Sequence, residues 1–78
     1  MAVGENVKQL THRQYDAIEN AITHGRRLAV FRRGTEYVVI PQRLRTVGSR
    51  EAMDSVHPTT GDQITIFLDE MDRFEVVA

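Results

Sequence analysis

The sequence contains no cysteine and no tryptophan, and only 6% of its residues are aromatic. Without cysteine, neither a disulfide bond nor a thiolate metal site can supplement the hydrophobic core, and this absence fits a reducing compartment. The longest apolar run, residues 37–41, is far too short to span a bilayer, and residues 1–9 lack the basic start and apolar run of a signal peptide. We therefore expect a cytoplasmic protein that does not bind a membrane.

The signatures of enzymatic chemistry are absent as well. The chain has no Gly-x-Ser-x-Gly elbow, no phosphate-binding glycine loop and no zinc-ligand spacing. His12, Asp16 and Glu19 share one face of a predicted helix, but polar residues belong on that face in any case. The acidic segment 68–75 lacks the glycine of a calcium loop. We expect no enzyme activity, no metal and no cofactor, and a barrel of this size is expected to lack a pocket of ~300 Å³ or more.

The charged residues are segregated along the chain, although the formal net charge is only −1. Residues 24–50 carry seven arginines and a single acid, Glu36, which gives this part a net charge of +6. Residues 51–78 carry seven acids and a single arginine, Arg73, which gives a net charge of −6. Such segregation predicts either a surface that faces a polyanion or two complementary parts that pair within the fold.

Residues 10–25 predict a helix with a defined start and end. Thr11 is a suitable N-cap, and Gln14 three residues later completes a capping box. Gly25 supplies the left-handed residue that commonly follows a helix. The apolar residues recur at helical spacing and predict one narrow buried stripe, formed by Tyr15, Ala17, Ile18, Ala21 and Ile22.

After Gly25 the hydrophobic period changes from 3.6 to 2, which predicts strands. The expected strands are residues 27–33, 36–40, 50–57, 63–70 and 73–77, separated by turns at 34–35, 48–49 and 58–62. Pro41 cannot donate a ladder hydrogen bond, and we expect it to end the second strand. In the first strand Leu28 and Val30 are expected to point inward, and in the fourth Ile64, Ile66 and Leu68 share one face.

One helix followed by about five antiparallel strands is typical of an α+β domain with a small curled sheet or an SH3-like or Sm-like barrel. The helix is expected to cover one open end of the barrel. Residues 10–78 form a single small domain in this interpretation, and residues 1–9 form a flexible N-terminus.

The order of these residues resembles a WYL domain over about residues 17–77. Residues 21–45 contain the end of a helix, a basic pair, a hairpin and a Pro-x-x-Leu step, and residues 64–77 contain a Leu-Asp segment before a final strand. The resemblance implies an Sm-like barrel and ligand sensing, because WYL domains typically occur in bacterial regulators and bind nucleic acid or nucleotides. Residues 51–53 take the place of the Trp-Tyr-Leu element without matching it, so the resemblance carries over the fold and no ligand residue.

The candidate ligand-binding residues are the arginines around the predicted hairpin and one aromatic residue between them. An exposed aromatic ring among guanidinium groups suits stacking on a base together with charge pairing to phosphates. The alternative is that Phe31 is buried and that the arginines pair with the acidic C-terminal third. The candidate set is Arg26, Arg27, Phe31, Arg32, Arg33, Arg43 and Arg45.

These observations favour a small non-enzymatic binding module of regulatory type. Its expected ligand is a nucleic acid, a nucleotide or a protein segment. The alternative is a protein-interaction or self-association domain without nucleic-acid binding, in which an exposed sheet edge pairs with a second copy.

Overall fold

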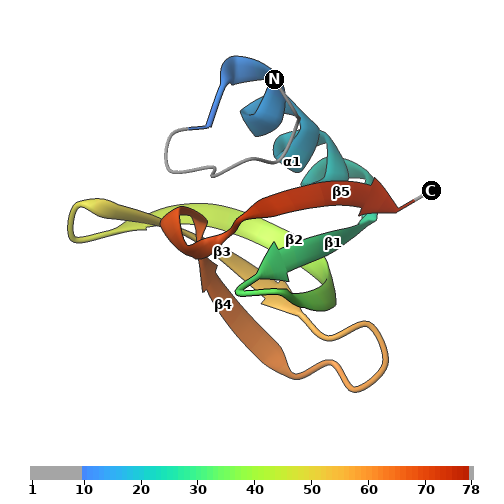
Figure 1. Cartoon of the computed structure of the whole chain (residues 1–78). Helices are drawn as coiled ribbons and strands as arrows, with labels where there is room; N and C mark the ends of the chain where they lie inside the picture. Colours follow the sequence, from blue (N-terminus) through green and yellow to red (C-terminus); the bar gives the residue numbers. More distant parts are fainter. Residues whose placement is uncertain (1–9, 78) are drawn as a thin grey trace.

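The computed structural model describes residues 10–77, so the prediction of a flexible segment 1–9 lies outside the described residues. Within this range the chain forms one α-helix, then five antiparallel strands that belong to one sheet (Figure 1). The elements are α1 (His12–His24), β1 (Arg27–Arg32), β2 (Thr35–Val47), β3 (Arg50–Val56), β4 (Gln63–Phe67), the 3-10 helix η1 (Leu68–Glu70) and β5 (Arg73–Val77).

Helix α1 has the predicted start and end. The Thr11 hydroxyl accepts a hydrogen bond from the Gln14 backbone N–H at 3.2 Å, and the Gln14 side chain accepts one from the Thr11 N–H at 2.8 Å. Gly25 follows the helix with φ 65°, and its N–H donates back to carbonyls of the last turn. In the described part of the chain no helix is long and apolar enough to cross a membrane.

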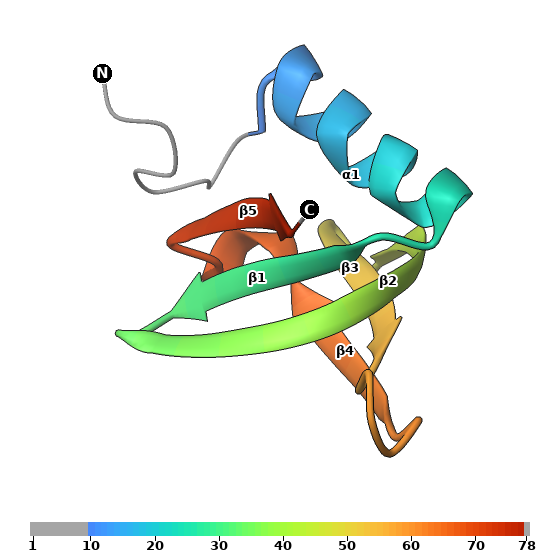
Figure 2. The ribbon, with the colours of Figure 1, turned by 90° about the vertical axis from the view of Figure 1, so that its right-hand side faces the viewer.

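The hairpin of β1 and β2 is confirmed, with its turn one residue earlier than the predicted 34–35, and the inward phase of β1 is confirmed as well. Arg33 and Gly34 form the turn with φ values of 52° and 76°, the left-handed pair that a tight two-residue hairpin needs. Leu28 and Val30 are both fully buried. Figure 2 shows β5, β1 and β2 side by side, with β5 at the end of the row nearest to α1.

The prediction that Pro41 ends the second strand is wrong. Strand β2 continues through Pro41 to Val47, pairing with β1 along its first part and with β3 along its second part. The register shifts between Pro41 and Arg43, which makes Gln42 the extra residue of a β-bulge. A bulge tolerates a proline because the ladder is locally interrupted there and resumes one residue later.

The fourth strand is shorter than predicted. Strand β4 ends at Phe67, and Leu68–Glu70 form η1, which is closed by a hydrogen bond from the Met71 N–H to the Leu68 carbonyl at 3.2 Å. Leu68 and Met71 are both buried, so the chain must turn there to bring both side chains into the core. The alternating pattern predicted a longer strand because Leu68 continues the alternation of apolar residues. Leu68 is apolar because it enters the core from η1, and not because it belongs to β4.

Every helix and strand contributes to one hydrophobic core. Its buried members are Ile18 and Ala21 of α1, Leu28 and Val30 of β1, Val39, Met53, Ile66, Leu68, Met71 and Phe74. The helix lies along one side of this core, where it contacts β2 and β5. The predicted domain with one helix and five antiparallel strands is therefore confirmed at this level.

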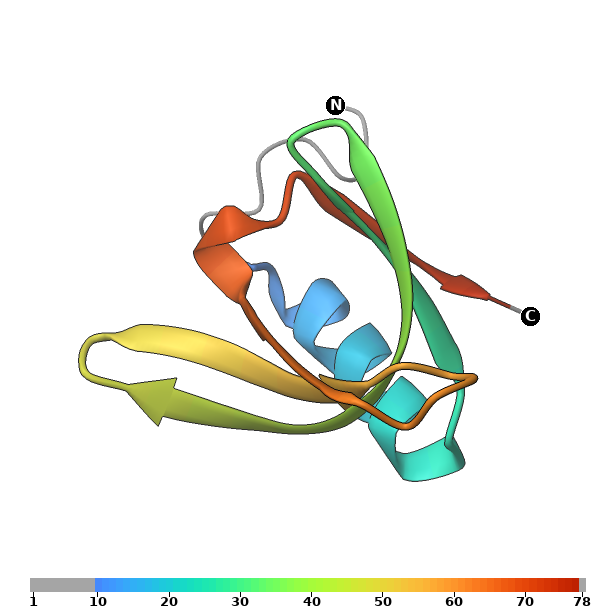
Figure 3. The same cartoon turned by 90° about the horizontal axis from the view of Figure 1, so that it is seen from below.

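The predicted curling and closure into a barrel are not observed in residues 10–77. The strand order is β4-β3-β2-β1-β5, and the two edge strands, β4 and β5, do not pair with each other. A barrel requires the ladder to continue around its circumference, whereas here η1 stands between β4 and β5. Figure 3 shows the end of the β2–β3 hairpin extending to one side of the molecule and the end of β5 to the other.

Candidate anion-binding site

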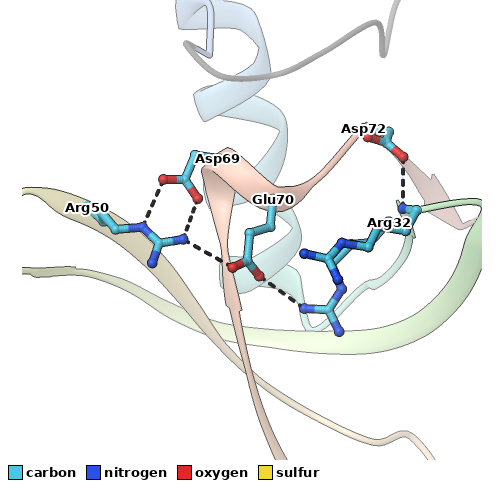
Figure 4. Close-up of polar contacts among 6 residues, drawn as sticks. Arg32, Arg50, Asp69, Glu70 and Asp72 are labelled. Carbon is cyan, nitrogen blue, oxygen red and sulfur yellow. Dashed lines mark hydrogen bonds and ion pairs between the residues drawn. The ribbon is translucent and has the colours of Figure 1, made fainter.

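The tip of the first hairpin contacts acids of the C-terminal third through the Arg32 side chain and the Arg33 backbone. The Arg32 guanidinium lies 3.3 Å from the Glu70 carboxylate and 5.1 Å from the centre of the Tyr37 ring. The backbone N–H of Arg33 donates to the Asp72 carboxylate at 2.9 Å. These contacts hold the hairpin tip against η1 and the residues that follow it (Figure 4).

Arg50 completes this contact region from the other side of η1. Its Nε and Nη2 donate to the two oxygens of Asp69 at 2.9 and 2.7 Å, and Nη2 also donates to Glu70 at 3.2 Å (Figure 4). Its guanidinium also lies 3.9 Å from the centre of the Phe67 ring. The hydrogen bonds with Asp69 raise the pKa of Arg50 and lower the pKa of the Asp69 carboxyl. Here the positive charge is balanced inside the fold.

Phe31 is half-buried on the outer face of β1. The Arg73 guanidinium of the neighbouring strand β5 lies 3.8 Å from the centre of its ring, and Arg73 also pairs with Glu75. One face of the Phe31 ring is thus covered by an arginine of the same chain. The ring is not presented for base stacking on that face.

Arg26 and Arg27 are exposed at the start of β1, and Arg33 is exposed in the turn. Their side chains make no ion pair with any residue between 10 and 77. The tip of the hairpin lies at the opposite end of β1 from Arg27. These residues belong to two separate regions of the surface.

A second arrangement forms where β2, β3 and β4 lie side by side. Arg43 is directly opposite Asp54 in the β2–β3 register, and Arg45 is two residues further along β2. Both arginines donate from Nε to the same carboxylate oxygen, Asp54 Oδ2, at 2.9 and 2.7 Å. The other oxygen accepts a hydrogen bond from the Thr65 hydroxyl on β4 at 3.2 Å. These hydrogen bonds, first that of Arg45, lower the pKa of Asp54 to about 2.

This geometry leaves the ends of both guanidinium groups available. The Nη atoms of Arg43 and Arg45 make no hydrogen bond to residues 10–77, and the Arg43 side chain is 70% exposed. One carboxylate neutralises one of the two cations, so the group keeps a net charge of about +1. Arrays of guanidinium N–H groups held in a fixed orientation bind phosphate or carboxylate oxygens bidentately.

A polar groove of about 470 Å³ lies over this group of side chains. Its volume corrects the expectation that the domain is too small for such a pocket: the sheet carries the groove on its surface and not inside a barrel. Gln42, the residue that the bulge adds to β2, is one of its lining residues. The groove is lined by Gln42, Arg43, Arg45, Asp54, Ser55, Val56, Gln63 and Thr65.

The structure therefore brings together Arg43 and Arg45 and separates them from the other candidate residues. Asp54 and Thr65, which orient the two arginines, were not among the sequence candidates. The only available signal was the expectation that both lie in strands. This expectation does not reveal that Asp54 lies beside Thr65 and the two arginines. The β3–β4 register decides that Thr65 faces Asp54, and the bulge after Pro41 decides which residue of β2 faces it.

A second groove, of about 670 Å³, lies between the N-terminal half of α1 and strand β5. Phe74 and Val76 have the same strand phase, yet Phe74 is buried whereas Val76 is 43% exposed. The groove is lined by Thr11, Arg13, Gln14, Ala17, Phe74, Glu75 and Val76.

Residues 10–77 contain no cluster of three or more histidine, aspartate or glutamate side chains suited to a metal ion.

No protein-family model matches the sequence, and neither a characterised protein nor a solved structure is detectably similar to it.

Proposed function

We propose that this protein is a small non-enzymatic binding module that takes the phosphate groups of a single-stranded nucleic acid on the outer face of β2, β3 and β4. The observation that carries the proposal is the fork formed by Arg43 and Arg45, in which Asp54 holds both Nε atoms while all Nη atoms stay available. Phosphate contacts of this kind supply affinity without reading the base sequence.

The contrast with Arg50 supports a binding role for the fork. Arg50 uses both Nε and Nη2 on carboxylates of its own chain. Arg43 and Arg45 share one carboxylate through Nε alone, so Asp54 orients them without saturating them. A carboxylate that only balanced charge could engage one guanidinium bidentately, as Asp69 does. In this proposal Asp54 is a positioning residue, and Gln42 and Gln63 supply amide groups to the lining of the groove.

A further positive charge lies at the start of β1, outside the fork itself. In β1, Arg27 precedes Leu28, whose partner in β2 is Val39, four residues before Arg43. Arg27 makes no ion pair with residues 10–77. A nucleic-acid strand could follow this surface from the fork toward the start of β1, with one phosphate about every 6–7 Å of extended chain, a spacing that residues two apart in a strand match.

We further propose a regulatory role and a relation to a known class of small domains. A regulatory role in the bacterial cytoplasm and a relation to Sm-like or WYL domains rest on the sequence resemblance and on the coarse agreement of one helix before five antiparallel strands. A nucleotide could occupy the same fork with a single phosphate group. A protein partner is the alternative class, and the groove beside β5 supports it.

Titration of a labelled single-stranded oligonucleotide at several salt concentrations tests the proposal. With both arginines engaged, the slope of log affinity against log salt should be roughly −1.4, and Arg43→Ala or Arg45→Ala should each change it by about 0.7. Arg13→Ala is the matched control, because it removes the same charge from helix α1 beside the other groove. Equal effects of all three substitutions, or no binding at low salt, would refute a site at the fork.

A further inference from the structure

Strand β5 is an open edge of the sheet next to an apolar groove. One of its sides pairs with β1, and its other side pairs with no strand among residues 10–77. Val76 and Val77 on this strand are 43% and 37% exposed. An exposed strand edge with apolar side chains favours pairing with a further strand, because its unpaired N–H and C=O groups are satisfied in doing so.

We propose that β5 pairs with β5 of a second copy, giving a dimer with two-fold symmetry. A strand that pairs with its own copy does so antiparallel about the symmetry axis, and each residue of one copy then faces a residue fixed by the position of that axis. The charged residues of β5 favour one position of the symmetry axis. They do so because Arg73 and Glu75 are two residues apart and lie on the same face of the strand.

With the axis at Phe74, each Arg73 faces Glu75 of the other copy, and two attractive pairs form by symmetry. With the axis at Glu75, two carboxylates face each other directly, which destabilises a strand pair. The charge pattern of β5 is thus complementary to itself in one antiparallel register. The same register brings the two Phe74 residues together at the centre, on the face that carries the groove.

The other edge of the sheet does not have these properties. Strand β4 has no charged residue between Gln63 and Phe67, so a pairing with its own copy has no charged pair to set its register. The groove beside it is the polar one around Asp54. The dimer proposed through β5 leaves that groove open, and it does not depend on the nucleic-acid proposal.

Charge-reversal variants in sedimentation equilibrium provide the test. The wild-type protein should dimerise between micromolar and millimolar concentration. Arg73→Glu places one acid against each Glu75, and Glu75→Arg places one arginine against each Arg73, so each variant alone should dimerise at least about tenfold more weakly than the wild type. An equimolar mixture of the two variants should form a heterodimer, because all facing charges are again opposite. Far-UV circular dichroism of each variant establishes that it is folded, since Arg73 also stacks on Phe31.

The single variants and their mixture together distinguish this register from other associations. A wild-type protein that stays monomeric at millimolar concentration overturns the proposal. It is equally overturned if the single variants dimerise like the wild type, or if their mixture stays monomeric while both are folded. If the natural occupant of this edge is an extended peptide or a different strand, one of these three contradicting results is expected.

Discussion

At the scale of single residues, Asp54 connects three strands. It accepts hydrogen bonds from Arg43 and Arg45 of β2 and from Thr65 of β4, while it lies in β3 between them. Two cations and a hydroxyl all favour its charged form, which is why its pKa falls to about 2. The residue that orients the proposed site is thus also one that links the strands beneath it.

The low pKa of Asp54 predicts a dependence of stability on acid. A carboxyl whose pKa is lowered by folding contributes stability that is complete above its ordinary value of 3.8 and is lost as the pH falls toward about 2. The melting temperature should therefore drop over this window, and Asp54→Asn should make the drop shallower. Thermal unfolding of both proteins between neutral and acid pH measures it. Asp62→Asn, in the turn before β4, is the control and should leave the shape of the curve unchanged.

Ser55 is a buried polar residue whose hydroxyl has no hydrogen-bond partner among residues 10–77. Its side chain is 2% exposed, and its hydroxyl finds no partner in the described part of the chain. It stands opposite Pro41, which has no N–H to offer, and opposite Ile64 of β4.

Ser55→Ala should therefore leave stability unchanged or raise it by up to ~1 kcal/mol, since no hydrogen bond is lost and a buried hydroxyl is removed. Urea unfolding of the two proteins gives the difference. A loss of more than ~1 kcal/mol would show that the hydroxyl is in fact paired.

At the scale of elements, the local signals were reliable where a side chain acts on its own neighbours. The capping box of Thr11 and Gln14 and the left-handed Gly25 act within one turn of chain, and all were recognisable before the fold was known. Pro41 and Leu68 were misjudged because their roles depend on distant partners. Pro41 is accommodated by a bulge opposite β3, and Leu68 is drawn into a core that five strands and a helix form together.

The strand and helix phases predict a contrast between buried and exposed positions. Ile18 of α1 is fully buried, Ile66 of β4 is 2% exposed, and Thr65 lies on the opposite, exposed face. Ile18→Ala and Ile66→Ala should each destabilise the fold by ~2–4 kcal/mol, as cavity-forming substitutions do. Thr65→Ala should cost clearly less, as measured by denaturant unfolding. Equal costs for Thr65 and Ile66 would contradict the register of β4.

At the scale of the whole molecule, the segregated charges are partly reunited by folding. The basic residues Arg32 and Arg50 meet the acids of η1, and Arg43 and Arg45 meet Asp54. Exposed ion pairs of this kind contribute little stability each, so their main effect is to decide which guanidinium groups are engaged within the fold. Arg26, Arg27 and Arg33 have no ion pair within residues 10–77, and the fork keeps its Nη groups.

The order of elements, the helix boundaries, the first hairpin and the inward faces of β1 and β4 could all be predicted from the sequence, because period and capping are local properties of the chain. The site could be predicted only as a set of arginines. Which of them meet was decided by the tertiary structure, because strand register, the bulge at Gln42 and the turn of η1 determine the neighbours of each guanidinium. Closure of the sheet was likewise beyond local pattern, since it depends on whether β4 and β5, separated by η1, come close enough to pair.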